Sequence, residues 1–205
     1  MSKKGNNDFK LVIAGVGGQG TLLASRLLAL SAIKAQLPVR VGEIYGAAQR
    51  GGPVMGQIQI GEGRGPQICP GEADVLLGFE EAETVRRSVT FLQKDGRVIM
   101  NSHRFPAAEV ISGMAEYPKR ETLMAWLREI TSNIVAFDAT LLAEKAGDPI
   151  TTNTVLLGAL CATGLLPFEE NTFIDTLKEK IRPIYHDINL KAFNIGKKAY
   201  MDIIG

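Results

Sequence analysis

The chain has 205 residues, enough for one α/β domain with a sizeable core. Apolar residues make up 45% of it and charged residues 22%, as is usual for globular proteins. Its 23 basic and 22 acidic residues give a net charge of +1, so no overall field attracts nucleic acid or an anionic membrane. No stretch approaches the roughly 20 uncharged apolar residues of a bilayer crossing. We therefore expect a cytoplasmic protein with one domain, 1–205, and a flexible polar tail at 1–8.

Apolar periodicity predicts strands that alternate with helices. The run 9–14 is continuously apolar, which is typical of a parallel strand buried on both faces. Residues 54–60 alternate between apolar and polar, which predicts a strand with one wetter face. A turn is expected at 94–96. The other strands are predicted at 39–44, 74–79, 97–100 and 134–137. Helices are predicted at 19–36, 80–92, 122–131, 139–146, 154–163, 169–181 and 188–204. This order predicts an α/β fold with a doubly wound, mostly parallel Rossmann-like sheet and a helical C-terminal region.

The predicted helix 19–36 is apolar almost all round. Its long polar side chains beyond the cap are Arg26, Lys34 and Gln36. Such a helix is buried on more than the side that faces the sheet. Either the C-terminal region covers it or it forms a subunit interface, and the sequence leaves both explanations open.

The sequence Gly15-Val-Gly-Gly-Gln-Gly20 joins the first strand to this helix. Glycines here permit a tight turn and close approach of the backbone, and a helix N-terminus stabilises anions through free N–H groups and the helix dipole. Gln19 could add a side-chain amide. The spacing fits G-x-G-x-x-G, a pattern that is weak evidence when it occurs alone.

A second glycine-rich loop, 45–53, follows the next predicted strand. Gln49 and Arg50 are its large polar residues, and Gly51 and Gly52 follow them. An arginine fork among small residues suits a phosphate, a carboxylate or the carbonyls of a partner. Ligands gather at the carboxyl ends of strands in doubly wound sheets, so both loops are expected to face one crevice.

A dinucleotide site is the first alternative for this crevice. It requires an acidic residue at the end of the second strand, and Glu43 is roughly in place. However, a nine-residue loop follows Glu43 instead of a packing helix. A stand-alone Rossmann-like nucleotide-binding protein, either an NAD(P) dehydrogenase or a sensor, therefore remains the alternative function. In a third interpretation the glycines only let the helix lie close to the sheet.

The sequence offers no catalytic residue and no metal site. Its two cysteines, Cys69 and Cys161, are far apart, and so are its two histidines, His103 and His186. An iron–sulfur cluster normally takes four cysteine ligands, so this chain cannot hold one by itself.

Several motifs together resemble one family. The two glycine-rich loops are followed by Gly71-Glu-Ala-Asp-Val-Leu-Leu77, then by Asn153-Thr-Val-Leu-Leu-Gly158 and by Asn189-x-x-Ala192-x-x-x-Gly196. In this order they resemble the gamma subunit, or gamma domain, of 2-oxoacid:ferredoxin oxidoreductases. The form Gln49-Arg-Gly-Gly52 is most similar to the small (beta) subunits of the indolepyruvate, or arylpyruvate, branch.

The resemblance implies one subunit of an enzyme for oxidative decarboxylation of a 2-oxoacid with coenzyme A as co-substrate. Thiamine diphosphate, Mg²⁺ and [4Fe-4S] clusters are then expected on a larger partner subunit, with none bound by this chain alone. Ferredoxin would be an indirect partner, and self-association of this chain is left open. The residues expected to contact a cofactor or co-substrate are Gly15, Gly17, Gly18, Gln19, Gly20, Gln49, Arg50, Gly51 and Gly52.

Overall fold

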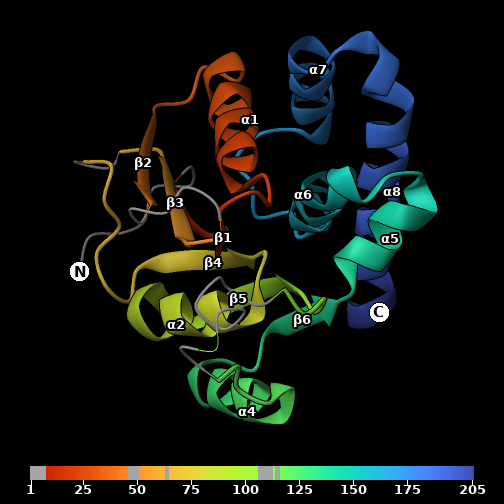
Figure 1. Cartoon of the computed structure of the whole chain (residues 1–205). Helices are drawn as coiled ribbons and strands as arrows, with labels where there is room; N and C mark the ends of the chain where they lie inside the picture. The colour runs from red at the N-terminus through yellow and green to blue at the C-terminus, as the bar shows by residue number, and fades with distance from the viewer. Residues whose placement is uncertain (1–7, 46–50, 63–64, 106–112, 114–115) are drawn as a thin grey trace.

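A six-stranded sheet forms the centre of the protein (Figure 1). The computed structural model describes residues 8–45, 51–62, 65–105, 113 and 116–205, so the expected tail lies almost wholly outside it. The strand order is β2-β3-β1-β4-β5-β6. The strands are β1 (Phe9–Val16), β2 (Val39–Tyr45), β3 (Pro53–Ile60), β4 (Ala73–Gly78), β5 (Leu92–Asn101) and β6 (Ile134–Phe137). Strands β1, β4, β5 and β6 pair in parallel, whereas β3 is antiparallel to both of its neighbours. The mostly parallel sheet is confirmed.

Helices cover both faces of the sheet, as expected for a doubly wound fold. Leu11 and Ile13 of β1 belong to the core under α1, α5, α6, α7 and α8, whereas Val12 and Ala14 belong to the core under α2 and α4. This alternation explains why β1 is apolar throughout. The helices are α1 (Thr21–Lys34), α2 (Glu81–Phe91), α4 (Arg120–Ile130), α5 (Ala139–Ala146), α6 (Thr152–Ala162), α7 (Glu170–Lys180) and α8 (His186–Ile204). Two 3₁₀ turns, η1 (Pro149–Thr151) and η2 (Pro183–Tyr185), precede α6 and α8.

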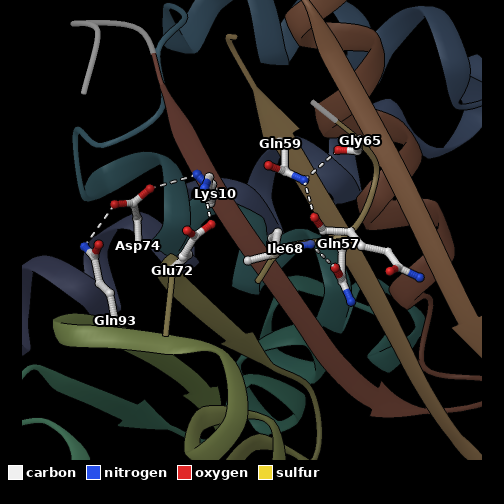
Figure 2. A network of polar contacts seen from close by, with 9 residues as sticks. Lys10, Gln57, Gln59, Gly65, Ile68, Glu72, Asp74 and Gln93 are labelled. Carbon is white, nitrogen blue, oxygen red and sulfur yellow. Dashed lines mark hydrogen bonds and ion pairs between the residues drawn. The ribbon is translucent and has the colours of Figure 1, made fainter. Parts of the chain in front are cut away.

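The wetter face expected on β3 does not exist. Gln57 and Gln59 are only 3% and 4% exposed, because the segment that follows β3 crosses over their side of the sheet. Ile68 donates its backbone N–H to Gln57 Oε1 at 2.5 Å, and Gln59 Nε2 donates to the carbonyls of Gly65 and Gln67 at 2.7 and 2.8 Å (Figure 2). The glutamines are polar because they satisfy the backbone of this covering segment, not because they face water.

The turn expected at 94–96 is also wrong. Strand β5 runs through these residues, and its pairing with β4 shifts from Ala73–Leu92 to Val75–Arg97. Asp95 adopts a φ of 62° at this irregularity. Asp-Gly is a turn signal, but here it marks a bulge-like interruption inside one strand.

Two glycines bring α6 and α8 into unusually close contact. A Cβ atom on Gly196 would lie 1.8 Å from the carbonyl oxygen of Val155, and one on Gly158 would lie 2.1 Å from that of Phe193. Thr154 Oγ1 also donates to Asn189 Oδ1 at 2.7 Å, and Asn189 Nδ2 donates to the carbonyl of Tyr185 at 2.9 Å. The position of α6 is therefore tightly fixed by α8.

The C-terminal helices account for part of the apolar character of α1, and a subunit interface stays a prediction for the rest. One side packs against the C-terminal helices, and Lys34 Nζ pairs with Glu179 of α7 at 2.5 Å. On the other side Leu22, Leu23 and Ile33 remain 41%, 40% and 58% exposed. Among the described residues, no helix has the length and apolar character needed to span a membrane.

Candidate functional site

The two glycine-rich loops meet at one edge of the sheet. The backbone N–H of Gly17 donates to the carbonyl of Gly52 at 2.9 Å, and the N–H of Gly51 donates back to the carbonyl of Gly17 at 3.2 Å. The two loops were expected on neighbouring strands, but β3 lies between β1 and β2, and the start of β3 carries the second loop to the end of β1. Gln49 and Arg50 lie outside the described residues.

Gln19 holds the first loop in shape. Its Oε1 accepts the N–H of Val16 at 2.9 Å, and its Nε2 donates to the carbonyl of Phe79, just after β4, at 3.1 Å. Gly15 is needed beneath this side chain, because a Cβ there would lie 2.7 Å from Gln19 Oε1. The amide expected to face a ligand is thus engaged in tying the glycine loop to β4.

A pocket of about 360 Å³ opens beside the loop. Gly20, the N-cap of α1, has a φ of 81° and supplies no side-chain cap, so the first turn of α1 directs backbone N–H groups toward this end that no side chain of the described residues caps. Gly18 has a φ of 103°, and no described atom lies within 4 Å of the position that its Cβ would take. The pocket is lined by Gly17, Gly18, Gly20, Thr21, Leu22, Tyr45 and Val54. Backbone donors and an apolar wall therefore face the same small space.

A shallower groove of about 780 Å³ continues from this pocket along α1 and β2. Leu22 and Tyr45 line both cavities, so the two form one continuous surface. Arg26 and Glu43 face the groove, and neither has an ion pair within the described part of the chain. The other lining residues are Leu23, Ala29, Leu30 and Val41.

The position of Glu43 argues against a dinucleotide site. A ribose-binding carboxylate belongs on the strand next to β1. Here β3 separates β2 from β1, which puts Glu43 two strand spacings, or about 10 Å, from the strand that carries the glycine loop. The side chain instead lines the groove on α1.

Buried carboxylates follow β4 at the same edge of the sheet. Glu80 caps α2 by accepting the N–H groups of Ala82 and Glu83, and it also accepts the hydroxyl of Tyr117. Burial raises the pKa of Glu81, a shift that Arg120 opposes and Glu80 reinforces. Burial, with the hydrogen bond to Glu80, also raises the pKa of Tyr117. These groups fasten the start of α2 to the segment before α4.

The remaining nucleophiles and histidines do not converge on the pocket. His103 Nδ1 lies 3.3 Å from Asp138 Oδ2, and His186 Nε2 donates to the carbonyl of Ile181 at 2.8 Å. Burial raises the pKa of the Cys161 thiol, while Cys69 is exposed. No three metal-ligating side chains gather among the residues whose structure is described.

These features define an α/β domain with a glycine-rich edge and an apolar groove alongside it. Residues 10–199 match the family of pyruvate ferredoxin/flavodoxin oxidoreductases. The chain belongs to this family.

Relatives and solved structures agree with this assignment. The chain is 38% identical over 200 residues to the indolepyruvate oxidoreductase subunit IorB of Thermococcus kodakarensis, an alignment that covers 97% of this chain and 98% of the relative. The structure of pyruvate oxidoreductase subunit PORC from Thermotoga maritima is 25% identical, with a TM-score of 0.69 and 94% and 97% of the two chains covered. The fold also matches 32% of a 2-oxoglutarate:ferredoxin oxidoreductase chain from Magnetococcus marinus, at 20% identity and a TM-score of 0.71 over 97% of this chain.

Proposed function

We propose that this chain is the small subunit of a ferredoxin-dependent 2-oxoacid oxidoreductase that acts on indolepyruvate or a related arylpyruvate. It completes a larger subunit, which carries thiamine diphosphate, Mg²⁺ and iron–sulfur clusters and uses coenzyme A to accept the acyl group. The observation that carries the proposal is the glycine-rich pocket, continuous with an open apolar groove, in a chain as long as small-subunit relatives. The pocket takes phosphate oxygens of coenzyme A, and the groove takes the larger subunit.

Coexpression with the larger subunit tests the function directly. The complex is expected to reduce ferredoxin with indolepyruvate and coenzyme A under anaerobic conditions, and this chain alone is expected to be inactive. Pyruvate and 2-oxoglutarate, compared in the same assay, identify the preferred acid. Tight binding of NAD(P) by the isolated chain, with no association between the subunits, would favour the stand-alone alternative.

The groove on α1 and β2 suits a protein surface that combines apolar and charged side chains. Its apolar walls favour burial, and Arg26 and Glu43 require a partner that offers an acidic and a basic side chain. The larger subunit is the occupant that the proposed function supplies, because the groove leads into the pocket where coenzyme A would enter. Arg50, which precedes Gly51 in the sequence, is a further candidate for contact with the larger subunit or with coenzyme A.

Leu23→Asp is expected to weaken association with the larger subunit by at least about tenfold, since it places a charge in a face that must lose its water on binding. Gel filtration of the coexpressed subunits and titration of one subunit with the other measure this effect. Val89→Asp is the matched control, because Val89 is 69% exposed on α2, on the opposite face of the sheet. If Leu23→Asp assembles as well as Val89→Asp, the groove is not the interface.

A further inference from the structure

Strand β2 lies at the edge of the sheet and pairs on one side only, with β3 (Figure 1). Just beyond Val39–Ile60, the first pair of this ladder, the N–H of Gly61 donates to the carbonyl of Pro38 at 2.8 Å. Hydrogen-bonded and non-hydrogen-bonded pairs alternate along an antiparallel ladder. The residues of β2 whose main chain bonds to β3 are therefore Arg40, Gly42 and Ile44.

The ladder between β1 and β3 gives the same alternation. The N–H of Gly17 donates to the carbonyl of Gly52 at 2.9 Å, so these residues form a hydrogen-bonded pair just beyond Val16–Pro53, the last pair of that ladder. Counted from there, the even-numbered residues of β3 bond to β1 and the odd-numbered ones to β2. The residues of β2 that direct both N–H and C=O to the open edge are thus Val39, Val41, Glu43 and Tyr45. No hydrogen bond to these outward groups is found in the described ranges.

This edge is not protected against pairing. Strand β2 contains neither a proline nor a bulge, and Arg40 is engaged with the carbonyl of Gly61. Val41, Ile44 and Tyr45 are 36%, 49% and 52% exposed. Proteins normally blunt or cover an edge strand, because its free main-chain groups pair readily with another chain. A regular, half-apolar edge indicates that an extended polypeptide segment covers it in the assembled protein.

The open edge belongs to the same surface as the groove on α1 and β2. The side chains of Val41, Glu43 and Tyr45 line the groove, and Tyr45 also lines the pocket beside the glycine loop. A second copy of this chain suits the edge poorly. Antiparallel self-pairing over the whole strand centres on Gly42, and it puts the two Glu43 carboxylates at diagonal positions on one face, where like charges repel. The occupant of the groove is therefore the better partner for the edge.

We propose that β2 pairs along its open edge with an extended segment of the larger subunit, so that the sheet continues across the interface. The inference rests on the proposed function and adds main-chain hydrogen bonds to the side-chain contacts of the groove. Val41 and Glu43 exchange hydrogen bonds with the added strand, which supplies affinity that depends little on sequence. The Glu43 carboxylate supplies specificity, because it favours a segment that brings a basic side chain over the groove.

Hydrogen exchange resolved to single amides tests the pairing on the unaltered chain. In the chain alone, the amides of Val41 and Glu43 are expected to exchange quickly and those of Arg40, Gly42 and Ile44 slowly. In the complex with the larger subunit, Val41 and Glu43 should slow by at least about tenfold while the other three change little. Unchanged rates at Val41 and Glu43 in the complex would overturn the proposal. Slowing that rises with the concentration of this chain alone would assign the edge to a second copy, and it would overturn the proposal too.

Val41→Pro removes one outward donor from the edge. Proline is tolerated on an edge strand where the N–H faces solvent, so pairing with β3 should survive. The Kd for the larger subunit is expected to rise at least about tenfold, because an acceptor on the added strand is left without a donor. Val41→Ala is the matched control, since it shortens the same side chain and keeps the N–H, and it should raise the Kd less than about threefold. Equal losses in the two variants would mean that only the side chain is recognised. If Val41→Pro fails to fold, the exchange rates of the unaltered chain decide.

The outcomes separate this inference from the proposed function. If Leu23→Asp weakens assembly while Val41 and Glu43 exchange as in the free chain, the groove is the interface and only the strand pairing fails. If the two subunits do not associate at all, the proposed function itself fails.

Discussion

Replacing Gly196 with alanine is expected to destabilise the subunit more than alanine at any other described glycine of the C-terminal helices. The new Cβ would lie 1.8 Å from the carbonyl oxygen of Val155 and 2.7 Å from its carbon. These are backbone atoms, so no side chain can rotate away and α8 must move off α6. Alanine regains about 1 kcal/mol of helix propensity, but the forced separation costs more, and we expect a net loss of about 2 kcal/mol or more in the free energy of unfolding. The thermal midpoint should fall by roughly 5 °C or more.

Gly65→Ala is the control for this substitution. A Cβ on Gly65 meets no described atom within 4 Å, so the methyl group should be tolerated with little change in the thermal midpoint. Urea denaturation of both variants gives the free energies. Equal stabilities for the two would mean that α6 and α8 are not as close in solution as in the structure.

The local elements could be predicted because their signals are local. Strand Ile134–Phe137 and helix Ala139–Ala146 lie where the apolar runs place them, with Asp138 between them as the N-cap that accepts the N–H of Leu141. The strand–glycine loop–helix unit at the start of the chain could also be predicted, because clustered glycines indicate a turn in which the backbone adopts a positive φ. These inferences needed no knowledge of which strands are neighbours.

The order of the strands in the sheet could not be predicted from such local signals. No local sequence pattern indicates that β3 lies between β1 and β2. This position of β3 separates Glu43 from the glycine loop and brings Gly52 to Gly17. The alternation of apolar and polar residues in β3 predicted one solvent-exposed face. A sequence does not distinguish a glutamine that hydrogen-bonds to a covering segment, as Gln57 and Gln59 do, from one that hydrogen-bonds to water. Trp126, which helical spacing would assign to the core, is 47% exposed on α4 for a similar reason: periodicity does not say what covers a face.

The contact between Gly20 and Asn153 joins residues that are far apart in the chain, and it could not be predicted from spacing. The motif that begins at Asn153 was visible as part of the family resemblance, but its side chain had no assigned role. Its position depends on α8, which fixes α6 by two glycines and a buried pair of polar side chains. Contacts between distant segments thus depend on packing that sequence periodicity does not encode.

Replacing Gly18 with asparagine is expected to abolish most of the binding of coenzyme A while leaving the subunit folded. Gly18 has a φ of 103° and faces the pocket, so any side chain there occupies space that a ligand needs. Asparagine tolerates positive φ better than other residues, which limits the loss of stability to about 1–2 kcal/mol. Blocking close approach of the backbone should raise the Kd for coenzyme A by at least about tenfold, more than the loss of one side-chain contact.

Gly71→Asn separates the two effects of this substitution. Gly71 also has a positive φ, 74°, and open space about its Cβ among the described atoms, but it lies between Pro70 and β4, away from the pocket. Both variants should lose similar stability, and only Gly18→Asn should lose affinity for coenzyme A in calorimetry. Similar affinities in the two would mean that the ligand does not enter beside the glycine loop. The glycines would then serve only to bring α1 close to the sheet, and the groove on α1 and β2 would remain as the contribution of this chain to the complex.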